Sequence, residues 1–131
     1  MIQIGKTNTL TILRQTPPGM FLGNDENEVV LLPNKCIEPD FKVGDEIEVF
    51  IYKDSEDRLI ATRLKPYVEI NQFAFLNVSE VSRVGAFLDW GLEKDLFVPF
   101  KEQKQKMIEG HNYVVFIYLD ELTDRIVASS K

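Results

Sequence analysis

The feature of this sequence that most constrains its fold is an internal duplication. Residues 19–22 (GMFL) return as residues 85–88 (GAFL), an offset of 66 positions. The same offset relates residues 49–52 (VFIY) to residues 115–118 (VFIY). After one inserted residue, DRLIA near the end of the first copy matches DRIVA near the end of the second. A register held over this length indicates one supersecondary unit written twice.

The duplication predicts two domains, residues 1–66 and 67–131, joined by a short hinge at residues 65–67. Units of this size bury only a modest core, so we expect the two to pack together. A short hinge favours the same outcome because it limits how far the domains can separate.

Composition describes an ordinary soluble globular protein, with 44% hydrophobic and 27% charged residues. No apolar run approaches membrane-spanning length and no basic segment precedes an apolar signal core, so we expect a cytoplasmic protein without membrane contact. Cys36 is the single cysteine and His111 the single histidine. The sequence therefore predicts no disulfide, no metal site and no cofactor.

The charge balance limits the class of ligand. The chain carries 15 basic and 21 acidic residues, a net charge of −6. The two halves share this equally, at −3 each. A nucleic-acid site on this protein must therefore be a local patch rather than a field over the whole surface.

Period-two alternation and turn residues predict five strands in each copy. In the first copy we expect strands at residues 7–14, 21–23, 28–32, 46–52 and 58–64. In the second we expect them at residues 71–81, 86–90, 95–98, 113–119 and 125–129, with a two-turn helix at residues 101–108. This all-β plan, with a short helix between strands three and four, is typical of two tandem OB-fold barrels. A Tudor- or SH3-like small barrel is the alternative that the pattern leaves open.

Signals for catalysis are absent from the sequence. There is no glycine-rich phosphate loop, no nucleophile elbow and no cluster of metal ligands. Two acid pairs occur, Asp54 with Asp57 and Asp120 with Asp124, but each lies in a turn, where Asp side chains cap backbone groups. We therefore expect a protein that is not an enzyme.

The second copy resembles an S1 RNA-binding domain. The resemblance lies in residues 85–88 (GAFL), 95–99 (DLFVP) and 120–129. The wider phrase GAFLDWGLEKDLFVPFKEQ, with tandem barrels, resembles the bacterial conserved virulence factor B family, which is built of S1-like domains and a winged-helix domain. That resemblance implies RNA binding and regulation of gene expression, with the present chain as the N-terminal part of a longer protein.

The resemblance also implies site residues. S1 domains present an aromatic before the Gly-Ala-Phe, the Phe itself, a His on the third strand and an acid–arginine pair near the last strand. The positions that match are these: Phe87, Asp120 and Arg125 in the second copy, and Phe21, Asp54 and Arg58 in the first.

The aromatic and the His of that pattern are missing from both copies. Val84 and Val98 occupy the two positions in the second copy, and Pro18 and Leu32 in the first. Because stacked bases need aromatic faces, these substitutions predict weak or altered RNA binding.

Other residues are candidates to compensate. Ile47, Val49 and Ile51 alternate with two glutamates, Phe50 and Tyr52, which places both aromatics on the wetter face, half exposed. Phe116 and Tyr118 repeat them, and the four form either a stacking surface or a seam between barrels, with the seam favoured. Trp90, in the turn after the second strand, and Lys101, on the expected helix, complete the candidate RNA site.

The sequence thus predicts a non-catalytic module for single-stranded RNA, within a bacterial regulator of gene expression. The alternative is a protein-interaction module, in which RNA binding is absent or belongs to further domains. Net negative charge and the missing aromatic and His favour that alternative.

Overall fold

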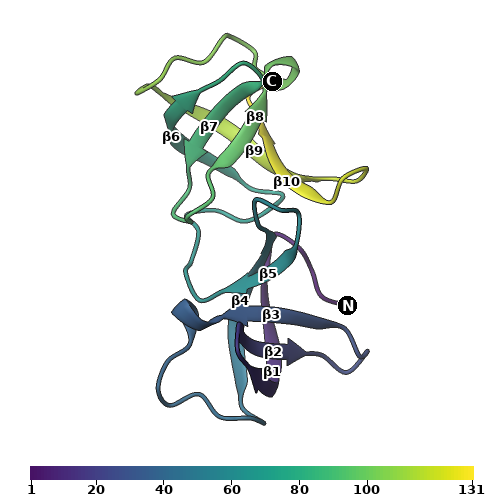
Figure 1. The fold of residues 1–131 in the computed structure, drawn as a ribbon. Helices are drawn as coiled ribbons and strands as arrows, with labels where there is room; N and C mark the ends of the chain where they lie inside the picture. Colours follow the sequence, from purple (N-terminus) through teal and green to yellow (C-terminus); the bar gives the residue numbers. More distant parts are fainter. The chain divides into compact units, whose positions relative to one another are not determined.

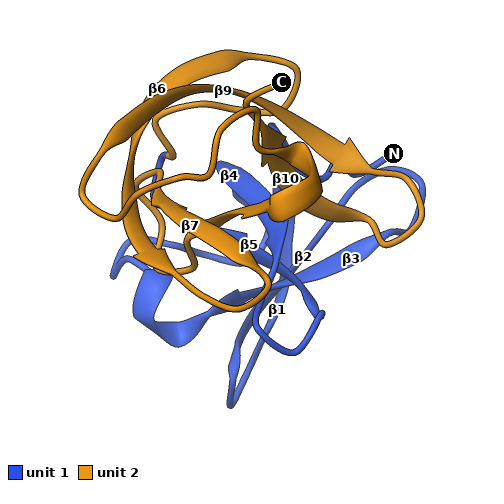
Figure 2. Cartoon of the chain, turned by 90° about the horizontal axis from the view of Figure 1, so that it is seen from above, with its two compact units in different colours: residues 1–65 blue, residues 66–131 orange.

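The computed structural model describes all 131 residues, which divide into two compact units, residues 1–65 and 66–131 (Figure 2). The strands of unit 1 are β1 (Thr7–Thr16), β2 (Gly19–Gly23), β3 (Val29–Pro33), β4 (Glu46–Lys53) and β5 (Leu59–Thr62). Those of unit 2 are β6 (Phe73–Val81), β7 (Gly85–Asp89), β8 (Leu96–Pro99), β9 (Asn112–Asp120) and β10 (Arg125–Ser129). One 3₁₀ turn follows the third strand of each unit, η1 (Asn34–Cys36) and η2 (Phe100–Glu102).

Each unit is a closed five-stranded barrel, with the strand order β1-β2-β3-β5-β4 in unit 1 and β10-β8-β7-β6-β9 in unit 2 (Figure 1). Neighbouring strands are antiparallel except at one seam, where β3 lies parallel to β5 and β8 parallel to β10. Closure leaves no strand edge open to pairing with another chain. The expected fold, an all-β pair of OB-type barrels with a short helix between strands three and four, is confirmed.

A glycine opens the second strand of each barrel because two backbones approach closely there. Gly19 pairs with Pro33, and Gly85 pairs with Pro99. A Cβ atom on Gly19 would overlap the carbonyl oxygen of Leu32, and one on Gly85 would overlap that of Val98. The duplicated Gly-x-Phe-Leu motif therefore begins with a residue that lets the second and third strands pair.

Alternation along the strands supplies the core of each barrel. Ile47, Val49 and Ile51 of β4 are buried, as the sequence predicts. The expectation that Phe50 is half exposed is wrong, since only 2% of its surface is accessible. Its ring stacks beside Tyr52 at 6.4 Å between centroids, and Tyr52 is partly buried, as expected. The two glutamates of β4 thus mark the outer face correctly but do not set the exposure of every residue on it.

The expected two-turn helix at residues 101–108 is wrong beyond its first turn, because η2 ends at Glu102. The buried side chain of Gln103 supplies the bonds that a helix would otherwise make. Its Nε2 donates to the Val98 carbonyl at 3.1 Å, and its Oε1 accepts from the Met107 amide at 2.9 Å. Met107 is buried, so this segment is held against the barrel as an ordered loop.

None of the helical turns is long and apolar enough to cross a membrane.

Candidate nucleic-acid interface

A row of outward-facing residues runs across all five strands of unit 1. Strand register pairs Tyr52 with Ile60, Ile60 with Leu31, Leu31 with Phe21 and Phe21 with Arg14. The first four are partly buried and Arg14 is exposed. The Arg14 guanidinium lies 4.5 Å from the centre of the Phe21 ring, within cation–π range. We call these five residues the outer row of unit 1.

Unit 2 carries a row at the equivalent register, although its Val127 is buried, at 8% exposure. Tyr118 pairs with Val127, Val127 with Phe97, Phe97 with Phe87 and Phe87 with Glu80. The Phe87 and Phe97 rings are 5.2 Å apart between centroids, in a tilted arrangement. Unit 2 therefore presents an aromatic pair on its second and third strands, where unit 1 presents Phe21 and Leu31.

A β-bulge places the charged ends of the two rows on the outer face. The β1–β2 register shifts between Ile12 and Arg14, and the β6–β7 register shifts between Val78 and Glu80. A bulge reverses the side on which the following residue lies. Arg14 and Glu80 consequently lie beside the two phenylalanines rather than one residue out of phase.

The acid–arginine pairs lie at the tips of the last hairpins, adjacent to the rows. Arg58 is two residues before Ile60, and Arg125 is two residues before Val127, so both arginines belong to the outer face. Arg58 Nε donates to Asp54 at 2.9 Å. Arg125 and Asp120 are cross-strand partners. The structure thus brings Phe21 and Arg58 to one face of unit 1, and Phe87, Asp120 and Arg125 to one face of unit 2.

Asp54 organises its hairpin as well as holding the arginine. Its Oδ1 accepts from the backbone amides of Glu56 and Arg58, both at 2.9 Å. Partial burial acts to raise the pKa of Asp54, but these amides and the Arg58 guanidinium outweigh it and bring that pKa below its ordinary value. In both hairpins the second acid of the pair, Asp57 or Asp124, has the left-handed backbone of a turn, at φ 62° and 57°. The interpretation of these acids as turn residues is confirmed.

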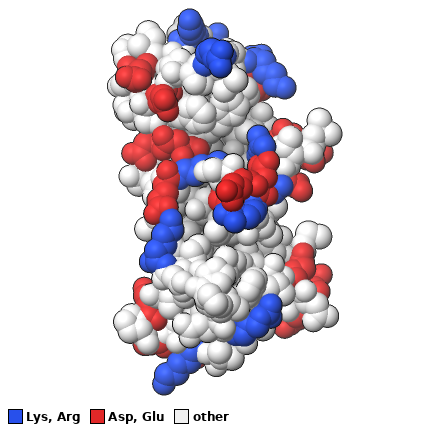
Figure 3. Space-filling view, in the orientation of Figure 1, with Lys and Arg blue, Asp and Glu red and all other residues white.

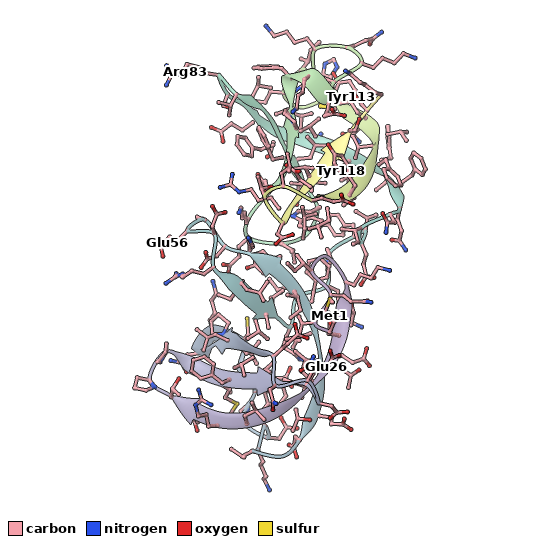
Figure 4. The ribbon with its side chains drawn as sticks, turned by 90° about the vertical axis from the view of Figure 1, so that its right-hand side faces the viewer. Met1, Glu26, Glu56, Arg83, Tyr113 and Tyr118 are labelled. Carbon is pink, nitrogen blue, oxygen red and sulfur yellow. The ribbon has the colours of Figure 1, made fainter.

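In unit 2, Tyr118 is the aromatic of the row that lies in the β9–β10 hairpin (Figure 4). Partial burial raises the pKa of its phenol, and the carboxylates of Glu102 and Asp120 add to the effect. The phenol is therefore protonated at neutral pH and can donate a hydrogen bond to a ligand.

Two of the predicted site residues lie away from the row. Trp90 is only 3% exposed, and its indole N–H donates to the Lys94 carbonyl at 2.8 Å. Its ring offers no open face for a base, since a buried polar aromatic packed and bonded in this way serves the fold. Lys101 is exposed in η2, at the end of the barrel opposite the Asp120–Arg125 hairpin.

Neither position that the resemblance assigns to the third-strand His faces outward. Val98 and Leu32 are fully buried and face the barrel interiors. The outward residue in the row is the one before each, Phe97 in unit 2 and Leu31 in unit 1. Phe97 is thus an aromatic of the outer face that the sequence analysis missed. Period-two alternation, with Leu96 and Val98 both inward, is the signal that identifies it.

Unit 2 also exposes a second apolar surface, on β6 and β9. Phe73 and Phe75 are 71% and 66% exposed, and Val114 is 59% exposed. Phe73 packs against Phe116 at 4.9 Å between ring centroids. At the equivalent positions unit 1 has Thr7, Thr9 and Glu48, whose cross-strand partners confirm the correspondence. The barrel fold therefore does not require aromatic residues there.

Charged side chains of both signs are interspersed over the face shown in Figure 3. No group of three or more His, Cys, Asp or Glu residues is arranged to hold a metal ion.

Comparison with known families accounts for this architecture. The S1 domain family matches the chain twice, over residues 4–64 and 72–131. Similar curated proteins include the uncharacterized protein YitL of Bacillus subtilis, 39% identical over 95 residues, 72% of this chain and 32% of the relative. Conserved virulence factor B of Staphylococcus aureus USA300 is 31% identical over 79 residues, 60% of this chain and 26% of the relative. The similarity to the conserved virulence factor B family is thus confirmed, and the chain spans about a third or less of these relatives' length.

A solved structure shares the fold. It is the crystal structure of a multidomain protein with nucleic acid binding domains from Streptococcus pneumoniae TIGR4, with a TM-score of 0.79 and 22% sequence identity. The match covers 98% of this chain and 46% of that one. The likeness supports the tandem-barrel fold of this chain.

Proposed function

Because the chain belongs to the S1 domain family, whose members are binding modules rather than catalysts, we propose that it binds single-stranded RNA along its outer rows. The observation that carries this proposal is the repetition of one register-paired row in both barrels, with Phe21 or Phe87 on the second strand of each. OB-type barrels bind oligonucleotides across these strands. The proposed setting is the cytoplasm of a bacterium, as part of a regulator of gene expression.

The roles of the residues follow from their chemistry. Phe87 and Phe97 stack on bases, and each stacked base contributes about 1–3 kcal/mol. In unit 1 Phe21 stacks on one face while Arg14, already 4.5 Å above its ring, turns outward to a base or phosphate. Arg58 and Arg125 contact phosphates from the hairpin side of each row.

Unit 2 is the stronger half of this interface in aromatic area, whereas the outer row ends in Arg14 in unit 1 and in Glu80 in unit 2. Arg58 has carboxylates on two sides, Asp54 at 2.9 Å and Glu56 at 2.8 Å. Phosphate must compete with both, so Arg58 contributes less binding free energy than an arginine without such partners. We therefore expect an affinity for short RNA in the micromolar range.

Fluorescence anisotropy of a labelled single strand of about ten nucleotides tests the proposal. Phe87→Ala combined with Arg125→Ala weakens binding by a factor of about ten or more. Phe75→Ala is the matched control, since it removes an exposed aromatic of the same unit that lies off the row. An unchanged affinity in the Phe87/Arg125 variant, or an equal loss in the control, contradicts the proposed site.

A second candidate function is a protein-interaction module, favoured by the exposed β6–β9 surface of Phe73, Phe75 and Val114. Unit 1 forms the same barrel without these aromatics, so the barrel fold does not require them. The test is co-purification from bacterial lysate with and without nuclease. Partners that survive nuclease but do not bind a Phe73→Thr/Phe75→Thr variant, which copies unit 1, favour this function over RNA binding.

A further inference from the structure

One end of unit 2 brings together segments that are distant in the sequence. Gly85, which follows the β6–β7 turn, pairs with Pro99, which precedes η2. Ser130, which follows β10, donates its amide to the Glu102 carbonyl at 2.9 Å. Residues 82–84, residues 100–108 and the end of β10 therefore lie at the same end of the barrel.

This end carries four cations with no carboxylate partner. Arg83, Lys101, Lys104 and Lys106 are all exposed, and none forms an ion pair within the chain. We call these four residues the basic end. Figure 4 shows Arg83 at the tip of its turn, directed away from the barrel. Figure 3 shows Lys and Arg side chains gathered at the uppermost end of unit 2.

The lysines of the basic end lie on the loop after η2, which hydrogen bonds hold to the barrel. The Lys104 amide donates to Ser130 Oγ at 3.0 Å. Lys106 precedes the buried Met107, whose amide is held by Gln103. A shallow hollow lined by Phe100, Gln103 and Lys106 lies on the same loop. Backbone anchoring of this kind lowers the entropy lost when the side chains take a fixed partner.

The corresponding loop of unit 1, residues 34–42, has no net charge, with two acids and two lysines. With the 66-residue offset, Lys104 and Lys106 correspond to Glu38 and Asp40, and Arg83 corresponds to Pro17. Lys101 alone keeps its charge, as Lys35. Two barrels of the same topology thus tolerate either sign in this loop, so the fold does not require the cations.

The opposite end of unit 2 is acidic. Residues 89–95 and 120–125, which form the β7–β8 and β9–β10 loops, contain six acidic and two basic residues. The net negative charge of those loops weakens phosphate contact there, Arg125 included, relative to contact at the basic end. The charge distribution of unit 2 therefore favours the basic end for the RNA backbone.

We propose that the basic end of unit 2 holds the sugar–phosphate backbone of the RNA strand whose bases stack on Phe87 and Phe97. This inference rests on the function proposed above and assigns that strand a path across unit 2. Pro99 lies two residues from Phe97, about 7 Å along the strand. A strand stacked on the aromatic pair therefore passes directly onto η2 and Lys101. Unit 1, with acids in the same loop, contributes stacking without this backbone contact.

The test compares the salt dependence of binding in two variants of the full chain. Lys104→Gln/Lys106→Gln removes two cations from the basic end, and Lys35→Gln/Lys42→Gln removes two from the equivalent loop of unit 1. For single strands the slope of log K against log salt is about −0.7 per phosphate contact. Between 50 and 200 mM salt, every two phosphate contacts weaken binding about 7-fold. We therefore expect the slope of the unit 2 variant to be less steep than that of wild type by about 1.4, so that its affinity falls about 7-fold less over this range, and an unchanged slope for the unit 1 variant.

An abasic strand of equal length separates backbone contact from stacking. We expect its binding to fall in Lys104→Gln/Lys106→Gln and to be unaffected by Phe97→Ala, while intact RNA is weakened by both. Intact RNA could bind while wild type and the unit 2 variant show the same salt slope and the same affinity for the abasic strand. In that case the proposal that the basic end holds the RNA backbone is wrong, and the proposed function stands. If wild type binds no RNA at tens of micromolar, the proposed function itself fails.

Discussion

The two barrels differ at positions where their shared fold allows any residue. Their outer rows have the same register, yet unit 1 carries Leu31 and Arg14 where unit 2 carries Phe97 and Glu80. Their interiors, by contrast, carry buried apolar residues at most matching positions, such as Leu22 with Leu88 and Ile51 with Ile117. A duplicated barrel thus serves as its own control. Residues that only one unit carries are not required by the barrel fold, so these differences show where the two surfaces can act differently.

The largest expected effect is on a feature that both barrels have. Gly85→Ala places a methyl group against the Val98 carbonyl, which can be relieved only by moving β7 from β8. We expect a loss of on the order of 3 kcal/mol in the free energy of unfolding of unit 2. Urea titration of the full chain, followed by NMR amide signals of each unit, measures it. Gly110→Ala separates steric overlap from backbone strain, because a Cβ there meets nothing within 4 Å while the residue has a left-handed φ of 86°. We expect it to cost only about 1–2 kcal/mol, from the left-handed backbone alone.

The next effect concerns the loop that follows the third strand of each barrel. Unit 2 uses the buried amide of Gln103, whereas unit 1 has the apolar Ile37 at the equivalent position, packed against its core. Gln103→Ile, which copies unit 1, leaves the Val98 carbonyl and the Met107 amide without partners. We expect a loss of about 1–3 kcal/mol in the stability of unit 2 and faster hydrogen exchange at the Met107 amide. Wild-type exchange at that amide contradicts this account of the loop.

A third prediction concerns the difference between the outer rows. Phe97→Ala removes half of an aromatic pair and lowers RNA affinity about tenfold, as expected for one stacked base. Leu31→Ala at the equivalent site of unit 1 removes no aromatic face, so we expect a change of less than about threefold. Anisotropy titrations at one salt concentration compare them. Equal losses would show that the rows act as apolar surfaces in general rather than as stacking platforms.

The smallest expected effect is the pH dependence of the β4–β5 hairpin. The folded-state pKa of Asp54 is lowered, so its contribution to stability is complete above its unfolded pKa, about 3.9, and is lost as the pH falls through the folded value. Asp54→Asn should therefore reduce the loss of unit 1 unfolding free energy on acidification below about pH 4, by less than about 1 kcal/mol. Urea unfolding between about pH 2 and pH 6 measures this pH dependence. The same pH dependence in wild type and variant contradicts the role given to Asp54.

Much of the fold was predictable from local pattern. Alternation located all ten strands, and the buried set of Ile47, Val49 and Ile51 followed from it. The helix at residues 101–108 failed because Gln103 bonds to Val98 and Met107 rather than to solvent. Its helix-forming composition was a weak preference that tertiary packing overrode.

The candidate site was predictable only in part. Phe87, Asp120 and Arg125 were identified by resemblance, and the structure places them on one face. The burial of Trp90 depends on tertiary packing that local pattern does not encode, and Phe97 was not among the predicted residues although its alternation with Leu96 and Val98 places it on the outer face.

That this protein is one small barrel written twice follows from its amino-acid order, because a duplicated register of apolar and turn residues leaves no other interpretation. The strands and their inward faces follow as well, since side chains alternate with a period of two. The interface, in contrast, depends on the folded barrel. Closing each barrel sets the last strand parallel to the third, so that Val127 meets Phe97 and two aromatics become part of a row across five strands. Pairings between remote strands and the bulges before Arg14 and Glu80 arise from closure of the sheet, which local periodicity does not encode.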